Sequence, residues 1–120
     1  MALRREEKVK KIILILALIL SISSFCFAGT VSKEITAVDE WTDPIAPLYG
    51  GKTGYLNVSI NGTWSGEVTL QRRYSGGDWG NVRTWTTNIE KALIDLEPKI
   101  QYRIGSTSYS SGTITVRLGN

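Results

Sequence analysis

Histidine is absent from this sequence of 120 residues, and cysteine occurs once, at Cys26. Histidine is the usual general base and the commonest transition-metal ligand in proteins, and Cys26 lies in a segment that we expect to be removed. The mature chain would then have no thiolate to serve as a nucleophile or as a zinc ligand. These absences favour a protein that is not an enzyme and that needs no metal ion and no cofactor.

Acidic residues leave two weaker chemical possibilities open. Four carboxylates are candidates for the pair that a glycosidase uses: Asp78, Glu90, Asp95 and Glu97. An acidic loop offers three oxygen donors to calcium: Asp39, Glu40 and Asp43. Neither set has the spacing of a known site, so a solvated acidic surface is the preferred interpretation.

Long hydrophobic runs are also scarce, and the longest covers residues 12–20. It follows a basic stretch and precedes small and mixed residues that end at Ala28. This order is typical of a secretory signal peptide. We therefore divide the chain into a signal peptide, 1–28, which would form a hydrophobic helix, and a domain, 29–120. Retention of the leader as a membrane anchor is one alternative, and lipidation of Cys26, which the bulky Phe25 disfavours, is another.

An excess of charge is missing from the predicted domain. The first 28 residues hold five of the 14 basic residues and two of the 11 acidic ones, which leaves nine of each for the rest of the chain. A neutral surface lacks the basic patch that binds a nucleic acid backbone. We expect no nucleic acid partner, and contact with a membrane only through the N-terminal segment.

Proline occurs only three times, and apolar and polar residues alternate over short stretches after Gly29. Alternation of this kind, interrupted by Gly, Asn, Ser and Asp, is typical of strands and turns. It predicts an all-β fold, a single small antiparallel β-sandwich of immunoglobulin-like or jelly-roll-like type with seven or eight strands. The predicted strands lie at 31–38, 56–60, 64–70, 81–87, within 88–97, at 100–104 and at 114–118.

Glycine-containing segments predict the turns between these strands. Asn61-Gly62 suits a type I′ hairpin, because both central residues of that turn need a positive φ. Gly66 suits a bulge in the return strand. Further turns are expected at 75–78 and 105–112. The segment 39–47 contains two prolines, which predict an edge strand or a crossing loop.

Residues 56–72 (LNVSINGTWSGEVTLQR) resemble a group of small β-sandwich structural proteins of tailed bacteriophages. The resemblance continues through 100–105 (IQYRIG) and ends at 109–118 (YSSGTITVRL). Members commonly carry an Asp-box turn similar to Ser-x-Asp-x-Gly-x-Thr-Trp, of which 73–79 (RYSGGDW) is an altered and shortened version. The resemblance implies a β-sandwich with a structural role in which this turn stabilises the fold. Most such proteins are not exported, so the leader indicates a prophage-derived gene or a bacterial secreted relative.

Aromatic and arginine side chains around the turn at 75–78 are the candidate contact residues. Exposed rings beside arginines bind other molecules by stacking and hydrogen bonding. The residues that we select are Trp79, Arg73, Arg83 and Tyr74. Three other aromatic residues fall in alternating strands and are predicted to lie in the core: Trp64, Trp85 and Tyr102.

Taken together, these features predict a non-enzymatic, exported structural or adhesion module of phage or prophage type that acts through surface contacts. Its partner would be a protein, either a virion component or a cell-surface component, or a glycan. The alternative is a secreted carbohydrate-binding module. The expected location is the periplasm, the extracellular medium or the cell surface, the virion if the gene belongs to a phage, or the membrane if the leader is retained.

Overall fold

A computed structural model describes residues 29–48 and 54–120, and this part of the chain is all-β with antiparallel pairing throughout. The five strands are β1 (Thr30–Ile35), β2 (Tyr55–Tyr74), β3 (Gly80–Trp85), β4 (Ile89–Ile94) and β5 (Ile100–Gly119). The predicted signal peptide lies outside the described residues. Within them, no helix is long and apolar enough to cross a bilayer.

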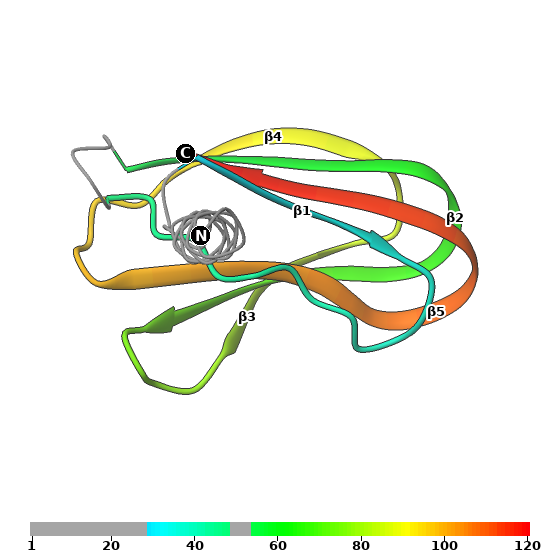
Figure 1. Cartoon of the computed structure of the whole chain (residues 1–120), viewed down its shortest axis with the longest axis horizontal. Helices are drawn as coiled ribbons and strands as arrows, with labels where there is room; N and C mark the ends of the chain where they lie inside the picture. The colour runs from blue at the N-terminus through cyan, green and yellow to red at the C-terminus, as the bar shows by residue number, and fades with distance from the viewer. Residues whose placement is uncertain (1–28, 49–53) are drawn as a thin grey trace, which may run out of the picture.

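Two long strands, β2 and β5, form the frame of the fold. Each has 20 residues, and they pair from Asn57↔Gly119 to Tyr74↔Ile100. Figure 1 shows the two strands curving together until the ribbon doubles back on itself. One half of the ribbon gains β1 beside β5 and β4 beside β2, and the other half gains β3 beside β2.

Glycines allow this ribbon to bend without a break. Gly62 and Gly112 both have positive φ, at 114° and 88°. A Cβ on Gly62 would collide with the carbonyl oxygen of Thr113, and one on Gly112 would collide with that of Thr63. The register of β2 against β5 shifts between Ser65 and Gly66 and again between Glu67 and Val68. Such bulges increase the local twist of the ribbon.

The continuous ribbon corrects two predicted turns and the predicted number of strands. Asn61-Gly62 is not a hairpin, and 105–112 is not a turn, because both lie inside the ladder of β2 and β5. Positive φ at these glycines serves a bend within a strand rather than a reversal of the chain. The described part therefore has five strands where seven or eight shorter ones were predicted.

Other predictions of local structure are confirmed. The register shifts at Gly66, which is the predicted bulge. Residues 75–77 form a turn, and a short strand lies within 88–97, at Ile89–Ile94. The segment 39–47 crosses beside β5 and touches it through two isolated bridges, Trp41↔Gly105 and Ile45↔Tyr102.

One hydrophobic core lies between the two halves of the ribbon. Its fully buried members include Leu56 from the first half of β2 and Leu70 from the second. Tyr102 is buried in the core, as predicted, whereas Trp64 and Trp85 are only partly buried and pack against the core. Packing therefore fills the inner face of most of β2 and β5, whereas β3 is exposed along nearly its whole length. An outer face or an edge is the more accessible place for a contact surface.

Each edge strand of the described sheet carries a cation on its inward side. Lys33 of β1 pairs with Val116, Arg83 of β3 with Leu70, and Lys91 of β4 with Val58. The three partners are core residues, so the cations extend from the rim of the core. Inward-pointing charges on edge strands oppose pairing with another sheet.

Candidate functional site

Two tryptophans and two arginines alternate across the outer face of the ribbon half that carries β3. The guanidinium carbon of Arg103 lies 4.3 Å from the Trp41 ring centroid and 4.6 Å from that of Trp79. The guanidinium carbon of Arg73 lies 4.3 Å from the Trp79 centroid. We call these four residues the Trp–Arg stack. Separations of this size are those of cation–π contacts.

The register of β2 and β5 places both arginines on one face. Gln71 pairs with Arg103, and Arg73 pairs with Gln101. Alternate residues of a strand share a face, so these four side chains project outward, opposite to core residues such as Leu70. Trp79 joins them from the end of the turn that connects β2 to β3.

Trp41 reaches the stack because Gly105 gives it room. The bridge Trp41↔Gly105 holds the crossing segment beside β5. A Cβ on Gly105 would lie 2.6 Å from two carbons of the Trp41 ring, which is too close for any side chain. The Trp41 indole nitrogen donates a hydrogen bond of 2.7 Å to Asp39 Oδ1, which fixes the ring.

Neutral amides orient the two guanidinium groups. Arg103 Nε donates to Gln71 Oε1 at 2.8 Å, and Arg73 Nε donates to Gln101 Oε1 at 2.8 Å. Gln71 Nε2 in turn donates to Asn81 Oδ1 of β3 at 2.9 Å. These hydrogen bonds fix the orientation of each guanidinium group, but a neutral amide does not neutralise its charge.

Partial burial of the stack acts on the charge of Arg103. Desolvation lowers the pKa of its guanidinium, Asp39 acts in the opposite direction, and neighbouring Arg73 lowers it further. Arginine stays protonated at ordinary pH, so this shift reports an unfavourable environment for the charge. An anion beside the two arginines would relieve it.

The structure brings together two of the four predicted contact residues. Trp79 and Arg73 are in the Trp–Arg stack. Tyr74, with 54 % of its surface exposed, follows Arg73 in β2 and therefore faces the other way. Arg83 is exposed on edge strand β3, opposite Leu70.

Sequence reasoning selected neither Arg103 nor Trp41 as a contact residue. The pairs Gln71/Arg73 and Gln101/Arg103 repeat one Gln-x-Arg spacing, which was an available signal for two strands with the same outer face. Their direct opposition depends on the register of β2 against β5. β2 and β5 were each predicted as several shorter strands, so the register between the two long strands was not predicted.

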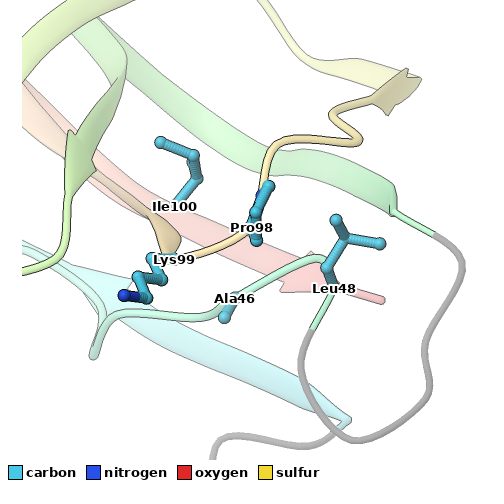
Figure 2. A pocket seen from close by; sticks show the side chains of 5 residues that line it. All are labelled: Ala46, Leu48, Pro98, Lys99 and Ile100. Atoms are coloured by element: carbon cyan, nitrogen blue, oxygen red, sulfur yellow. The ribbon is translucent and has the colours of Figure 1, made fainter.

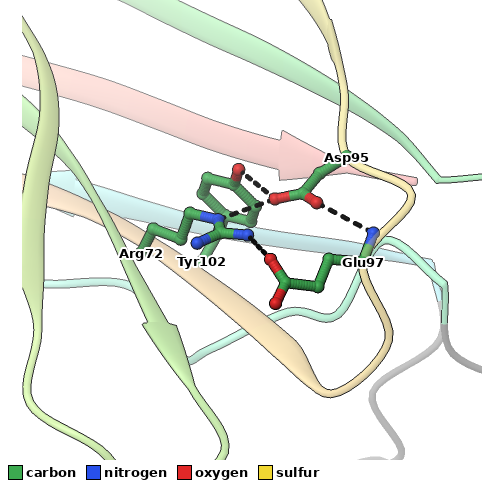
Figure 3. Close-up of polar contacts among 4 residues, drawn as sticks. All are labelled: Arg72, Asp95, Glu97 and Tyr102. Atoms are coloured by element: carbon green, nitrogen blue, oxygen red, sulfur yellow. Dashed lines mark hydrogen bonds and ion pairs between the residues drawn. The ribbon is translucent and has the colours of Figure 1, made fainter.

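A second polar cluster lies on the inner side of the same ribbon half (Figure 3). Arg72 Nε donates to Asp95 Oδ2 at 2.8 Å, and the Tyr102 hydroxyl donates to the same oxygen at 2.6 Å. Arg72 also binds Glu97 through Nη2. The cluster ties the connection between β4 and β5 to the inner face of β2.

Electrostatics in this cluster follow from burial and pairing. Burial would raise the pKa of Asp95, but hydrogen bonds from Arg72 and Tyr102 outweigh it, and the pKa is lowered. Burial, reinforced by Asp95, raises the pKa of Tyr102 to about 12. Two of the four carboxylates considered for a glycosidase pair, Asp95 and Glu97, are therefore partners of Arg72.

A small hollow of about 180 Å³ opens at one end of the fold (Figure 2). Its lining residues are Ala46, Leu48, Pro98, Lys99 and Ile100. The Lys99 amine is the one polar side-chain group among them. A hollow with this lining offers a ligand little beyond apolar contact.

Within 29–48 and 54–120, no group of three acidic, histidine or cysteine side chains is arranged to hold a metal ion. Comparisons of the chain with protein-family models, with curated proteins and with solved structures gave no match.

Proposed function

We propose that this chain is a non-enzymatic, exported structural or adhesion module of phage or prophage type, consisting of a signal peptide at 1–28 and a small β-sandwich at 29–120. Its partner is a protein component of a virion or of a cell surface. The observation that carries the proposal is the Trp–Arg stack, which presents rigid aromatic and cationic groups on the outer face of a sheet.

Residue chemistry supports a protein partner for this face. Tryptophan and arginine are the side chains most enriched where protein interfaces gain their binding energy. In the stack, both arginines and Trp41 are held by hydrogen bonds before any partner arrives. Less conformational entropy is then lost on binding.

The cations on the edge strands make an outer face of the sheet a more favourable contact surface than a strand edge. Lys33, Arg83 and Lys91 each place a cation on the inward side of an edge strand. Addition of a partner strand would have to accommodate these charges. The outer face with the Trp–Arg stack has no such obstacle.

Carbohydrate binding is the second candidate, supported by the aromatic rings and side-chain amides on one face. Sugar rings stack on open aromatic faces, whereas two guanidinium groups already lie over the Trp79 ring. Competition with these arginines makes sugar stacking on Trp79 less favourable. We therefore rank this function below protein contact.

Association with particles tests the leading function. Virions would be induced from cells that carry the gene, purified on a density gradient and probed with an antibody against the chain. The proposal predicts a signal that follows the particle band, or the cell envelope if the module acts at the cell surface. A chain found only as free protein in the medium, with binding to a glycan array that Trp79→Ala abolishes, would favour the carbohydrate module instead.

A further inference from the structure

Arg72 and Arg73 are neighbours in β2, yet only one of them is neutralised. Arg72 lies between Asp95 and Glu97 on the inner side. Arg73 projects to the outer side, where neither it nor Arg103 forms an ion pair with any residue of the described part of the chain. The outer face therefore holds two arginine charges that lack a carboxylate.

The acidic residue that acts on Arg103 does not fill this role. Asp39 is close enough to act on the pKa of Arg103. Its Oδ1 accepts the hydrogen bond from the Trp41 indole nitrogen, and no hydrogen bond joins it to Arg103 among the residues described. The charge of Arg103 is thus moderated but not paired.

Within the described residues, most hydrogen-bond donors of the two guanidinium groups have no partner. A guanidinium has five N–H donors, and in Arg73 and Arg103 the hydrogen bond found within the described residues uses Nε alone. The terminal nitrogens form the fork that binds a carboxylate through two parallel hydrogen bonds. Stacking on Trp79 and bonding to glutamines hold both forks in place.

We propose that Arg73 and Arg103, both held against the ring of Trp79, form a preorganised receptor for carboxylate groups on an acidic protein surface. The inference rests on the proposed function and specifies the chemistry of the partner. The receptor lies across the outer face of β2 and β5 and is not part of the hollow beside Lys99. Outer sheet faces suit the broad contact of a protein, whereas small ligands bind in concave pockets.

A titration followed by nuclear magnetic resonance tests the receptor. The isotope-labelled protein would be titrated with a short oligoglutamate peptide at low ionic strength, and the Nε–H signals of Arg73 and Arg103 would be followed with the indole N–H of Trp79. We expect saturable shifts of these signals. Because glutamine cannot replace the charge-assisted hydrogen bonds of arginine, Arg73→Gln with Arg103→Gln should weaken binding by about tenfold or more.

Matched variants separate the receptor from general electrostatics. Arg117→Gln removes an exposed charge from the other half of the ribbon, opposite Ser59, and should leave binding within about twofold. Arg103→Lys keeps the charge but loses the fork, so it should weaken binding while the dispersed spectrum of a folded protein is retained. Equal losses in the Arg117 and Arg103 variants would overturn the proposal.

Other anions define the remaining outcomes. Inorganic phosphate or polygalacturonate that shifts the same signals more strongly than oligoglutamate, at equal charge concentration, would overturn the assignment to an acidic protein. Absence of saturable shifts with oligoglutamate would overturn it as well. If the wild-type protein and the double arginine variant both follow the particle band, the assignment of the receptor to these arginines is wrong, although the proposed function stands.

Discussion

The guanidinium group of Arg103 lies between the rings of Trp41 and Trp79, 4.3 Å from the first centroid and 4.6 Å from the second. Trp41 comes from the segment that crosses beside β5, and Trp79 comes from the turn before β3. Arg103 therefore links two connections that have no strand pairing with each other in the described sheet. The environment of the Arg103 side chain therefore reports whether both connections lie where the structure places them.

Removal of the Arg103 side chain should destabilise the fold. Arg103→Ala loses two cation–π contacts, each worth about 0.5–1 kcal/mol at a partly exposed site, and the hydrogen bond to Gln71. We expect the free energy of unfolding to fall by about 1–2 kcal/mol, measured by urea denaturation. Arg117→Ala should change it by less than about 0.5 kcal/mol, and equal effects of the two variants would argue against the stack.

Acid should weaken the protein through Asp95. Its pKa is lowered in the folded state by Arg72 and Tyr102, so the unfolded chain binds the proton more readily. The stabilisation is complete above the unfolded value of about 3.9 and is lost as the pH falls through the lower folded value. Wild-type stability should fall more steeply in this acidic range than that of Asp95→Asn, in a series of urea denaturations. Parallel pH profiles would contradict this role.

Replacement of an edge cation should promote self-association. Lys91→Val gives β4 an apolar inward side next to Val58 and leaves its outer backbone groups open. Strands without such a charge pair with strands of other molecules. We expect concentration-dependent association in sedimentation velocity. The control is Thr115→Val, which lies in β5 between β1 and β2 and should stay monomeric. A monomeric Lys91→Val variant would show that the charge does not protect the edge of β4.

Substitution of a bend glycine should be costly. Gly112 has a φ of 88°, and a methyl group there would collide with the Thr63 carbonyl oxygen. A left-handed conformation costs a non-glycine residue about 1–3 kcal/mol, so Gly112→Ala should lower the thermal midpoint measured by circular dichroism. Gly76→Ala has a similar φ of 74° but open space around its Cβ, and should cost less. An equal loss in both would mean that φ, and not the close approach of β2 and β5, sets the cost.

Alternation of apolar and polar residues was sufficient to predict the class of fold. The alternation could reveal strands because the side-chain period of two is a local property of the chain. Glycines were harder to interpret, since a positive φ serves a tight turn and a bend within a strand equally well. At Asn61-Gly62 the partner strand decided between them, and pairing with a distant segment is not a local signal.

The candidate site was predictable only in part for the same reason. Trp79 and Arg73 are close in sequence, and the turn between them indicated that they would meet. Arg103 and Trp41 join them through the register of β5 and through the small size of Gly105. Neither follows from composition or spacing.

Proton chemical shifts of the Arg103 side chain test the central claim most directly. The claim is that the outer face carries a fixed stack in which Arg103 lies between two indole rings, ready for a partner. Ring currents would then shift its methylene protons upfield, and nuclear Overhauser effects would join them to the rings of both Trp41 and Trp79. Random-coil shifts without contacts to either ring would contradict the account.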